Sequence, residues 1–365
     1  MRVVAQWDDH RTDWLLGTTL RGPREARRYE IDGVAVNRIA LPAAVRRQLT
    51  PWVLAYYAIQ GPALARIARA LAAEIGPHAD GVDLIHNCRI GREGISFASL
   101  QVARARGVPL VLTPVHHPRW GGWLHRHFHR LYRQADAVIA LTQAERETLE
   151  QLGVDSRRIF ITGMGPILAD QPDGANFRER HGLGAASMVL FLGQQYRYKG
   201  VAALLAAAPL IWRRRPEARL VFAGPRTDYS RRLFGTNADS RILELGALDL
   251  QSKTDALAAC DVLCVPSSQE SFGGVYVEAW SLGKPVVAAA IPAVRCVVDD
   301  GVDGFLVPQS PAEIANRLLQ LLEQPALAAQ MGERGRAKAA ENYTWPRLAA
   351  LTEQAYEWAL HQSPG

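Results

Sequence analysis

The stretch DVLCVPSSQESFGGVYVEAWSLGKPVV, residues 261–287, joins an apolar run, a polar loop and an amphipathic segment. The apolar run covers 262–265; the loop contains Glu270, and two glycines then lead into the segment that carries Glu278. This pattern predicts a strand, a loop and a helix. A glycine-rich helix start offers unpaired backbone N–H groups to a phosphate, and carboxylates beside it suit sugar or ribose hydroxyls. The alternative interpretation is a capped structural helix.

Apolar runs alternate with helical periodicity on both sides of this stretch, which predicts parallel sheets covered by helices. The first half is predicted to contain strands at 2–6, 34–39, 82–86, 109–113, 137–141 and 159–162, and helices at 51–75, 94–106, 123–133 and 143–152. Gly61-Pro62 is expected to kink or split the first of these helices.

The second half continues the alternation. Its predicted strands are 188–192, 219–223, 242–245, 262–265, 285–289 and 305–307, and its predicted helices are 201–214, 252–259 and others that begin at 311, 326 and 346. A polar stretch from 163 to about 184 is the best candidate for a linker. We therefore expect an α/β protein with two doubly wound, Rossmann-like domains that face a cleft, with ligands at the carboxyl ends of the strands.

The overall composition excludes several classes of protein. The 365 residues suffice for two domains, and the net charge of +6 is mild, so it does not call for nucleic acid as a partner. The four cysteines form neither a Cys-x-x-Cys pair nor a zinc pattern, which predicts reduced, mostly buried thiols in a cytoplasmic protein. Neither a signal peptide nor a membrane-spanning segment is expected.

A second constellation, FLGQQYRYKG at 191–200, also leads from a predicted strand into a predicted helix. Lys199 and Arg197 would neutralise negative charge on a phosphate-bearing ligand at this helix start. Solvated cations at a helix start are the alternative. In the first half, His116 and His117 follow a predicted strand at the expected edge of the cleft, where histidines are site candidates.

The pattern Pro-Ser-x-x-Glu-x-Phe-Gly, followed by Glu-Ala and Gly-Lys-Pro-Val-Val, resembles the donor-site signature of the retaining GT-B glycosyltransferases of family 4. The resemblance covers nearly all of the second half and, more weakly, the first. It implies an N-terminal acceptor-side domain at 1–165, a nucleotide-sugar domain at 166–345, and a C-terminal helix at 346–365 that crosses back to the first domain.

The resemblance also implies roles for individual residues. Glu270 would face hydroxyls of the donor sugar, and Glu278 would hold the ribose. One of His116 and His117, which the spacing leaves undecided, would contact the donor sugar across the cleft. The backbone at Phe272, Gly273 and Gly274 would meet the sugar and the diphosphate, Gly193 and Gln194 would line the phosphate loop, and Gly224, Ala247 and Leu248 would border the base pocket unless they only form turns.

The sequence departs from the family pattern at three places. Gln194 stands where an arginine is usual, and Arg197 is the candidate to supply the missing charge. The stretch 292–296 stands where the family often has Gly-Gly-x-x-Glu. A first strand, a Gly-rich loop and a helix that usually precede 2–6 are not found, so either a start assigned too late or a degenerate, non-catalytic protein is expected.

The sequence thus predicts a retaining, hexosyltransferase-like enzyme that uses a UDP, GDP or ADP sugar without a metal or other cofactor. Its acceptor, whether glycan, lipid or small molecule, cannot be read from the sequence. A non-catalytic sugar-nucleotide-binding or scaffold protein is the first alternative, and a nucleotide-sugar epimerase is the second. We expect a cytoplasmic location, with peripheral contact to the inner face of the membrane as a further possibility.

Overall fold

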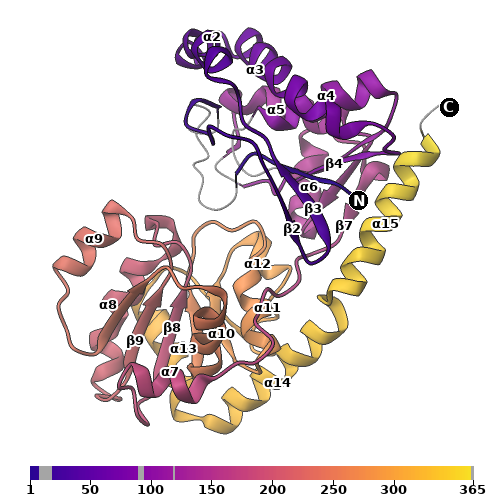
Figure 1. Cartoon of the computed structure of the whole chain (residues 1–365). Coiled ribbons are helices and arrows are strands. Elements are labelled where there is room, and N and C mark those ends of the chain that lie inside the picture. Colours follow the sequence, from indigo (N-terminus) through magenta and orange to yellow (C-terminus); the bar gives the residue numbers. More distant parts are fainter. Residues whose placement is uncertain (8–18, 89–93, 118–119, 363–365) are drawn as a thin grey trace.

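The computed structural model describes residues 1–7, 19–88, 94–117 and 120–362, which form two α/β lobes (Figure 1). A four-stranded parallel sheet, in the order β4-β5-β6-β7, is the centre of the first lobe. Its strands are short apolar runs because helices cover them, as where Leu110 and Leu112 share a core with Phe128. The elements are η1 (Gly76–Ala79), β4 (Ile85–Cys88), α4 (Ile95–Arg106), β5 (Leu110–Thr113), η3 (Trp123–His125), α5 (Arg126–Gln134), β6 (Ala137–Ala140), α6 (Gln143–Gln151), η4 (Ser156–Arg158) and β7 (Ile159–Ile161).

The chain begins with a separate three-stranded sheet, in the order β1-β3-β2. β1 (Val3–Ala5) and β3 (Val34–Arg38) are parallel, whereas β2 (Arg27–Ile31) and β3 form an antiparallel hairpin. Asp32 and Gly33 form its turn, both with positive φ (48° and 77°). Sequence reasoning missed β2 and expected only parallel strands, because the segment RRYEI is mostly exposed and has no apolar run.

The long helix expected at 51–75 is two helices. α2 (Ala43–Leu54) and α3 (Gln60–Ile75) are separated by the turn 55–59, so the predicted break at Gly61-Pro62 is wrong by a few residues. Pro62 lies in the first turn of α3, where a missing N–H costs no helical hydrogen bond.

The second lobe is built on a six-stranded parallel sheet in the order β10-β9-β8-β11-β12-β13. Counted from β8, this is the 3-2-1-4-5-6 order of doubly wound nucleotide-binding folds, with the switch point between β8 and β11. The segment expected to be a linker contains a short helix, α7, and a second helix that sequence reasoning missed, α9, follows β9. The elements are α7 (Gly174–Arg180), β8 (Met188–Leu192), η5 (Arg197–Lys199), α8 (Val201–Trp212), β9 (Arg219–Ala223), α9 (Asp228–Gly235), β10 (Ile242–Gly246), α10 (Leu250–Ala259), β11 (Val262–Val265), α11 (Gly274–Ser281), β12 (Val286–Ala289), α12 (Pro292–Arg295), β13 (Gly304–Val307), α13 (Pro311–Glu323) and α14 (Pro325–Asn342).

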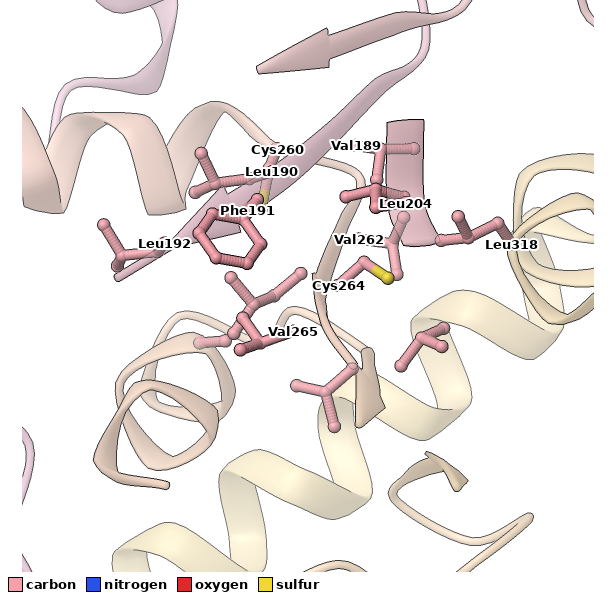
Figure 2. Packing of buried hydrophobic residues seen from close by; sticks show 14 of the residues in the cluster. Val189, Leu190, Phe191, Leu192, Leu204, Cys260, Val262, Cys264, Val265 and Leu318 are labelled. Atoms are coloured by element: carbon pink, nitrogen blue, oxygen red, sulfur yellow. The ribbon is translucent and has the colours of Figure 1, made fainter. Parts of the chain in front are cut away.

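The core of the second lobe lies around the two central strands. Figure 2 shows side chains of β8, such as Phe191, near those of β11, such as Val265, and both are buried. Burial on both faces explains why these strands read as continuous apolar runs. Of the four cysteines, which are all free, Cys260 and Cys264 belong to this core, whereas Cys88 and Cys296 are exposed rather than buried.

The last helix, α15 (Trp345–Gln362), runs from the second lobe along the first (Figure 1). Ala355 and Ala359 are fully buried against the sheet of the first lobe, in a cluster with Val111 of β5 and Ile139 of β6. Tyr356 adds a 2.8 Å hydrogen bond between its Oη and Nδ1 of a histidine on β4. The helix therefore ties the two lobes together. In the described part of the chain, every helix is too short or too polar to cross a membrane.

Candidate functional site

An ion pair joins the two loops at the switch point of the second sheet. The loop after β8 ends in η5 with Lys199, and the loop after β11 carries Glu270. The Lys199 ammonium donates to both carboxylate oxygens of Glu270, at 2.6 and 2.8 Å. The two side chains are only 19% and 10% exposed, so they are shielded from water but can still be reached. The two residues that the sequence assigned to diphosphate and sugar are thus in direct contact.

Glycines shape the backbone beside this pair. Gly273 has a φ of 92°, and a Cβ there would lie 2.4 Å from the ring of Tyr276. Gly224 has a φ of 133°, and a Cβ there would lie 2.0 Å from the carbonyl oxygen of Gly193. α11 begins at Gly274, and no side chain accepts a hydrogen bond from the backbone N–H groups at its start. Such a helix start attracts an anion.

Glu278 lies on α11, and its partner comes from α10. Lys253 donates to Oε1 of Glu278 at 2.8 Å and to the carbonyl oxygen of Ile167 at 2.5 Å. The Lys253 and Glu278 side chains are 20% and 10% exposed. Sequence reasoning missed Lys253, because a single lysine on a helix is usually a solvated surface residue, and its distance from Glu278 along the chain gives no signal.

His116 and His117 point in different directions at the edge of the first lobe. The His117 ring lies 5.7 Å from the ring of Tyr198, which precedes Lys199 in the second lobe. The His116 ring packs inside the first lobe, with Nδ1 3.4 Å from the hydroxyl of Tyr132. The hydroxyl of Ser271 donates to the carbonyl oxygen of His116 at 3.3 Å, so the two lobes meet here. Of the two histidines, His117 has the side chain beside the loop that follows β8.

The other predicted residues are more widely spread. Gln194 and Arg197 have exposed side chains on the loop after β8. The side chain of Phe272 is 2% exposed and packs on Tyr343, which leaves only its backbone for a ligand. Ala247 is exposed and Leu248 is half-buried. Both residues follow β10, which is the outermost strand on one side of the six-stranded sheet.

Gln195 is a further residue of this loop that sequence reasoning passed over. Its side chain is fully buried, and neither its amide nitrogen nor its amide oxygen has a hydrogen-bond partner among the described residues. Its backbone holds the loop in place, since the N–H donates to the carbonyl oxygen of Pro225 and the carbonyl accepts from the hydroxyl of Thr227. The loop is therefore fixed against the end of β9.

A buried carboxylate holds the histidine segment in position. Glu145 on α6 accepts hydrogen bonds from the backbone N–H groups of His116 (2.5 Å) and Leu141 (2.7 Å), and thereby links the loops that follow β5 and β6. Val115, next to His116, has a φ of 45°, which is strained for a β-branched residue. The carboxylate provides the partner that stabilises this conformation. The sequence does not indicate that Glu145 is buried, because the glutamates of a helix as polar as α6 are normally exposed to solvent.

We expect the contribution of Glu145 to stability to depend on pH. Burial raises its pKa from 4.5 to about 7, because desolvation outweighs the two hydrogen bonds. The folded state therefore holds the proton more tightly than the unfolded chain. The resulting stabilisation is complete below pH 4.5 and is lost as the pH rises through about 7.

Glu145→Gln isolates this effect. The amide leaves one buried N–H without an acceptor, which costs about 1–3 kcal/mol at every pH. In addition, as the pH rises from 4.5 to about 7, the free energy of unfolding of the wild type should fall by roughly 3 kcal/mol relative to that of the variant. Urea denaturation of both proteins across this pH range measures the difference, and a difference that does not change with pH would contradict the assignment.

His86, which lies within β4, is a packed residue. Its ring nitrogens lie 2.8 Å from the hydroxyls of Tyr356 and Thr113, and burial lowers its pKa to about 4. The described residues contain no group of three or more His, Cys, Asp or Glu side chains that could hold a metal ion.

Family models match most of the chain. Residues 1–165 match the model described as "Glycosyl transferase 4-like domain", and residues 186–324 match "Glycosyl transferases group 1". Among curated proteins, a D-inositol 3-phosphate glycosyltransferase of Pseudarthrobacter chlorophenolicus is 32% identical over 249 residues, which cover 65% of this chain and 59% of that protein. The chain thus spans less than two thirds of the length of the first curated relatives that it matches.

Solved structures agree on the fold. Sucrose-phosphate synthase from Thermosynechococcus elongatus superposes with a TM-score of 0.74 at 22% identity, over 93% of this chain and 87% of that one. HepE of Anabaena in complex with UDP-glucose superposes with a TM-score of 0.67 at 24% identity, over 79% and 81% of the two chains. The two family models show that the chain belongs to family 4 of the glycosyltransferases, and these structures show that it has the GT-B fold.

Proposed function

We propose that the protein is a retaining glycosyltransferase that moves a sugar from a nucleoside diphosphate sugar to a hydroxyl group of an acceptor, without a metal ion. The observation that carries this proposal is the shielded Lys199–Glu270 pair beside the uncapped start of α11. At the switch point of a doubly wound sheet, this site brings together a cation, a carboxylate that can accept hydrogen bonds from hydroxyls, and a helix start that attracts anions.

The donor fits this site in one orientation. The diphosphate lies against the N–H groups at the start of α11, within reach of Lys199, which exchanges part of its pairing with Glu270 for the phosphate charge. Glu270 is then free to accept hydrogen bonds from sugar hydroxyls, and Glu278, already held by Lys253, accepts them from the ribose. Gly224, Ala247 and Leu248 border the base. His117 faces the sugar from the other lobe.

The reaction needs no protein nucleophile. The bond between the anomeric carbon and the diphosphate oxygen breaks, and the acceptor oxygen forms its bond from the same face. The proton of the acceptor hydroxyl passes to the departing diphosphate. Lys199, Arg197 and the start of α11 stabilise the negative charge that develops there, which is the principal contribution of such a site to the rate. Positioning of the two substrates between the lobes supplies the rest.

A panel of UDP, GDP and ADP sugars tests the function. We expect one donor to release its nucleoside diphosphate in the presence of a hydroxyl acceptor, or slowly to water, and the product to keep the anomeric configuration of the donor in an NMR spectrum. Binding without turnover would instead indicate a sugar-nucleotide-binding protein, and release of an epimerised free sugar would indicate an epimerase. A product with inverted configuration would contradict the retaining mechanism.

A further inference from the structure

Five large apolar side chains are exposed at one end of the first lobe. They are Leu54 (67% exposed), Tyr57 (49%), Ile59 (39%), Trp123 (63%) and Leu124 (44%), and we refer to them as the apolar cap. The first three lie at the end of α2 and in the turn to α3, and the other two form the start of η3. In Figure 1, α2 and the start of α3 lie at the top of the upper lobe, away from the lower lobe. An exposed cluster of this kind marks an interaction surface more often than chance exposure.

Polar contacts join the two halves of the apolar cap into one surface. Gln60, which follows Ile59 and is 1% exposed, donates to the carbonyl oxygen of Leu124 at 3.3 Å. Arg126 donates to the amide oxygen of Gln60 at 2.6 Å, and its guanidinium lies 3.5 Å from the centre of the Trp123 ring. Segments that lie far apart in the sequence are therefore fixed side by side, with the indole of Trp123 held outward.

The inner faces of the same helices are fully used. Leu49 and Val53 of α2 and Leu64 and Ile67 of α3 are buried in one core cluster. The apolar cap is therefore additional to the residues that hold these helices on the lobe. Because nothing in the core requires apolar side chains on the outer face, their presence points to a ligand outside the chain.

The helices that carry the apolar cap are rich in arginine. Residues 43–72 and 121–134 contain seven arginines and no aspartate or glutamate. Since the whole chain has a net charge of +6, the remainder carries 6 − 7 = −1, so these two segments are more basic than the rest of the chain taken together. Arg47, Arg66, Arg69 and Arg130 are exposed there, and none of them forms an ion pair with another described residue.

We propose that the apolar cap and its arginines dock the protein on an anionic lipid bilayer. Aliphatic and aromatic side chains on arginine-rich helices match the boundary between acyl chains and negatively charged headgroups. A nucleic acid would use the rings of Tyr57 and Trp123, but it offers nothing to Leu54, Ile59 and Leu124, which have no ring on which a base can stack. The bilayer engages both parts of the surface.

Co-sedimentation of the full chain with vesicles tests the proposal. Neutral vesicles of phosphatidylcholine are compared with vesicles in which about a third of the lipid is phosphatidylglycerol. We expect partitioning at least roughly tenfold stronger to the anionic vesicles, and weaker binding at high salt. Equal partitioning to both kinds of vesicle, or none to either, would overturn the proposal.

Two double variants separate the apolar and the charged contributions. Trp123→Ser with Leu124→Ser, and Arg69→Gln with Arg130→Gln, should each reduce partitioning to anionic vesicles by about tenfold, while circular dichroism and the melting temperature stay near those of the wild type. Val302→Ser with Leu360→Ser changes two apolar side chains of similar exposure (44% and 42%) elsewhere, and Arg334→Gln removes an exposed charge on α14. These controls should bind as the wild type does.

The variants also distinguish the bilayer from other anionic partners. Loss of binding in the arginine variant alone, with the Trp123 and Leu124 variant unchanged, would show attraction to any polyanion and would overturn docking on a bilayer. Vesicle binding is measured without donor or acceptor, so its result does not depend on whether the proposed transferase activity is correct.

Discussion

Lys199→Ala is expected to lower kcat by about 10²–10³-fold, which is the usual cost of losing one preorganised group that stabilises developing negative charge. Lys199 is the shielded cation at the switch point, 2.6 Å from Glu270 and two residues before the start of α8. Its charge matters most when the diphosphate leaves, so KM for the donor should change less than kcat. Steady-state release of nucleoside diphosphate measures both constants.

Three further variants make this prediction specific. Lys199→Met keeps the aliphatic stem and should lose nearly as much activity as the alanine variant, because only the charge is at issue. Arg197→Ala removes an exposed cation and should have a smaller effect. Arg334→Ala removes an exposed cation on α14, outside the site, and should leave kcat unchanged. Activity of the Lys199 variants within twofold of the wild type would show that this cation does not serve the leaving group.

Glu278→Ala is expected to act on donor binding. Its carboxylate is 10% exposed and held by Lys253, so it is ready to accept hydrogen bonds from the ribose hydroxyls. Loss of such charged hydrogen bonds should raise Kd for the nucleoside diphosphate sugar by roughly ten- to hundredfold. Isothermal titration with the wild type and the variant measures the change.

The same substitution leaves Lys253 without its carboxylate, so the folded state must be checked. Glu278→Gln keeps an oxygen that can accept from a hydroxyl and should lie between the wild type and the alanine variant in affinity. A melting temperature close to that of the wild type would show that weaker binding is not caused by partial unfolding. If the alanine variant is folded and binds the donor as well as the wild type does, the assignment of Glu278 to the ribose is wrong.

The second lobe could be predicted from sequence because its strands are buried on both faces. Runs such as 188–192 and 262–265 are apolar throughout, and each is followed by a loop whose glycines and charges are concentrated within a few residues. The strand order then brings two of these loops together, which explains why Lys199 and Glu270 meet although 71 positions separate them.

The features that sequence reasoning missed lack such a pattern. β2 is an exposed, charged strand whose pairing is local to a hairpin. Lys253 and Glu145 act through tertiary contacts with residues that are distant in sequence, and each reads as an ordinary surface residue of a polar helix face. The direction of the His116 and His117 side chains depends on the strained backbone at Val115, which no sequence pattern indicates.

Calorimetric titration with a nucleoside diphosphate sugar is the most direct test of the central claim that the loops after β8 and β11 form a donor site. UDP, GDP and ADP sugars are titrated in turn into the wild type and into Glu278→Ala. The account predicts saturable binding of at least one donor to the wild type, with one site per chain, and clearly weaker binding to the variant. Failure of every donor to bind the folded wild type, or equal affinity for both proteins, would contradict it.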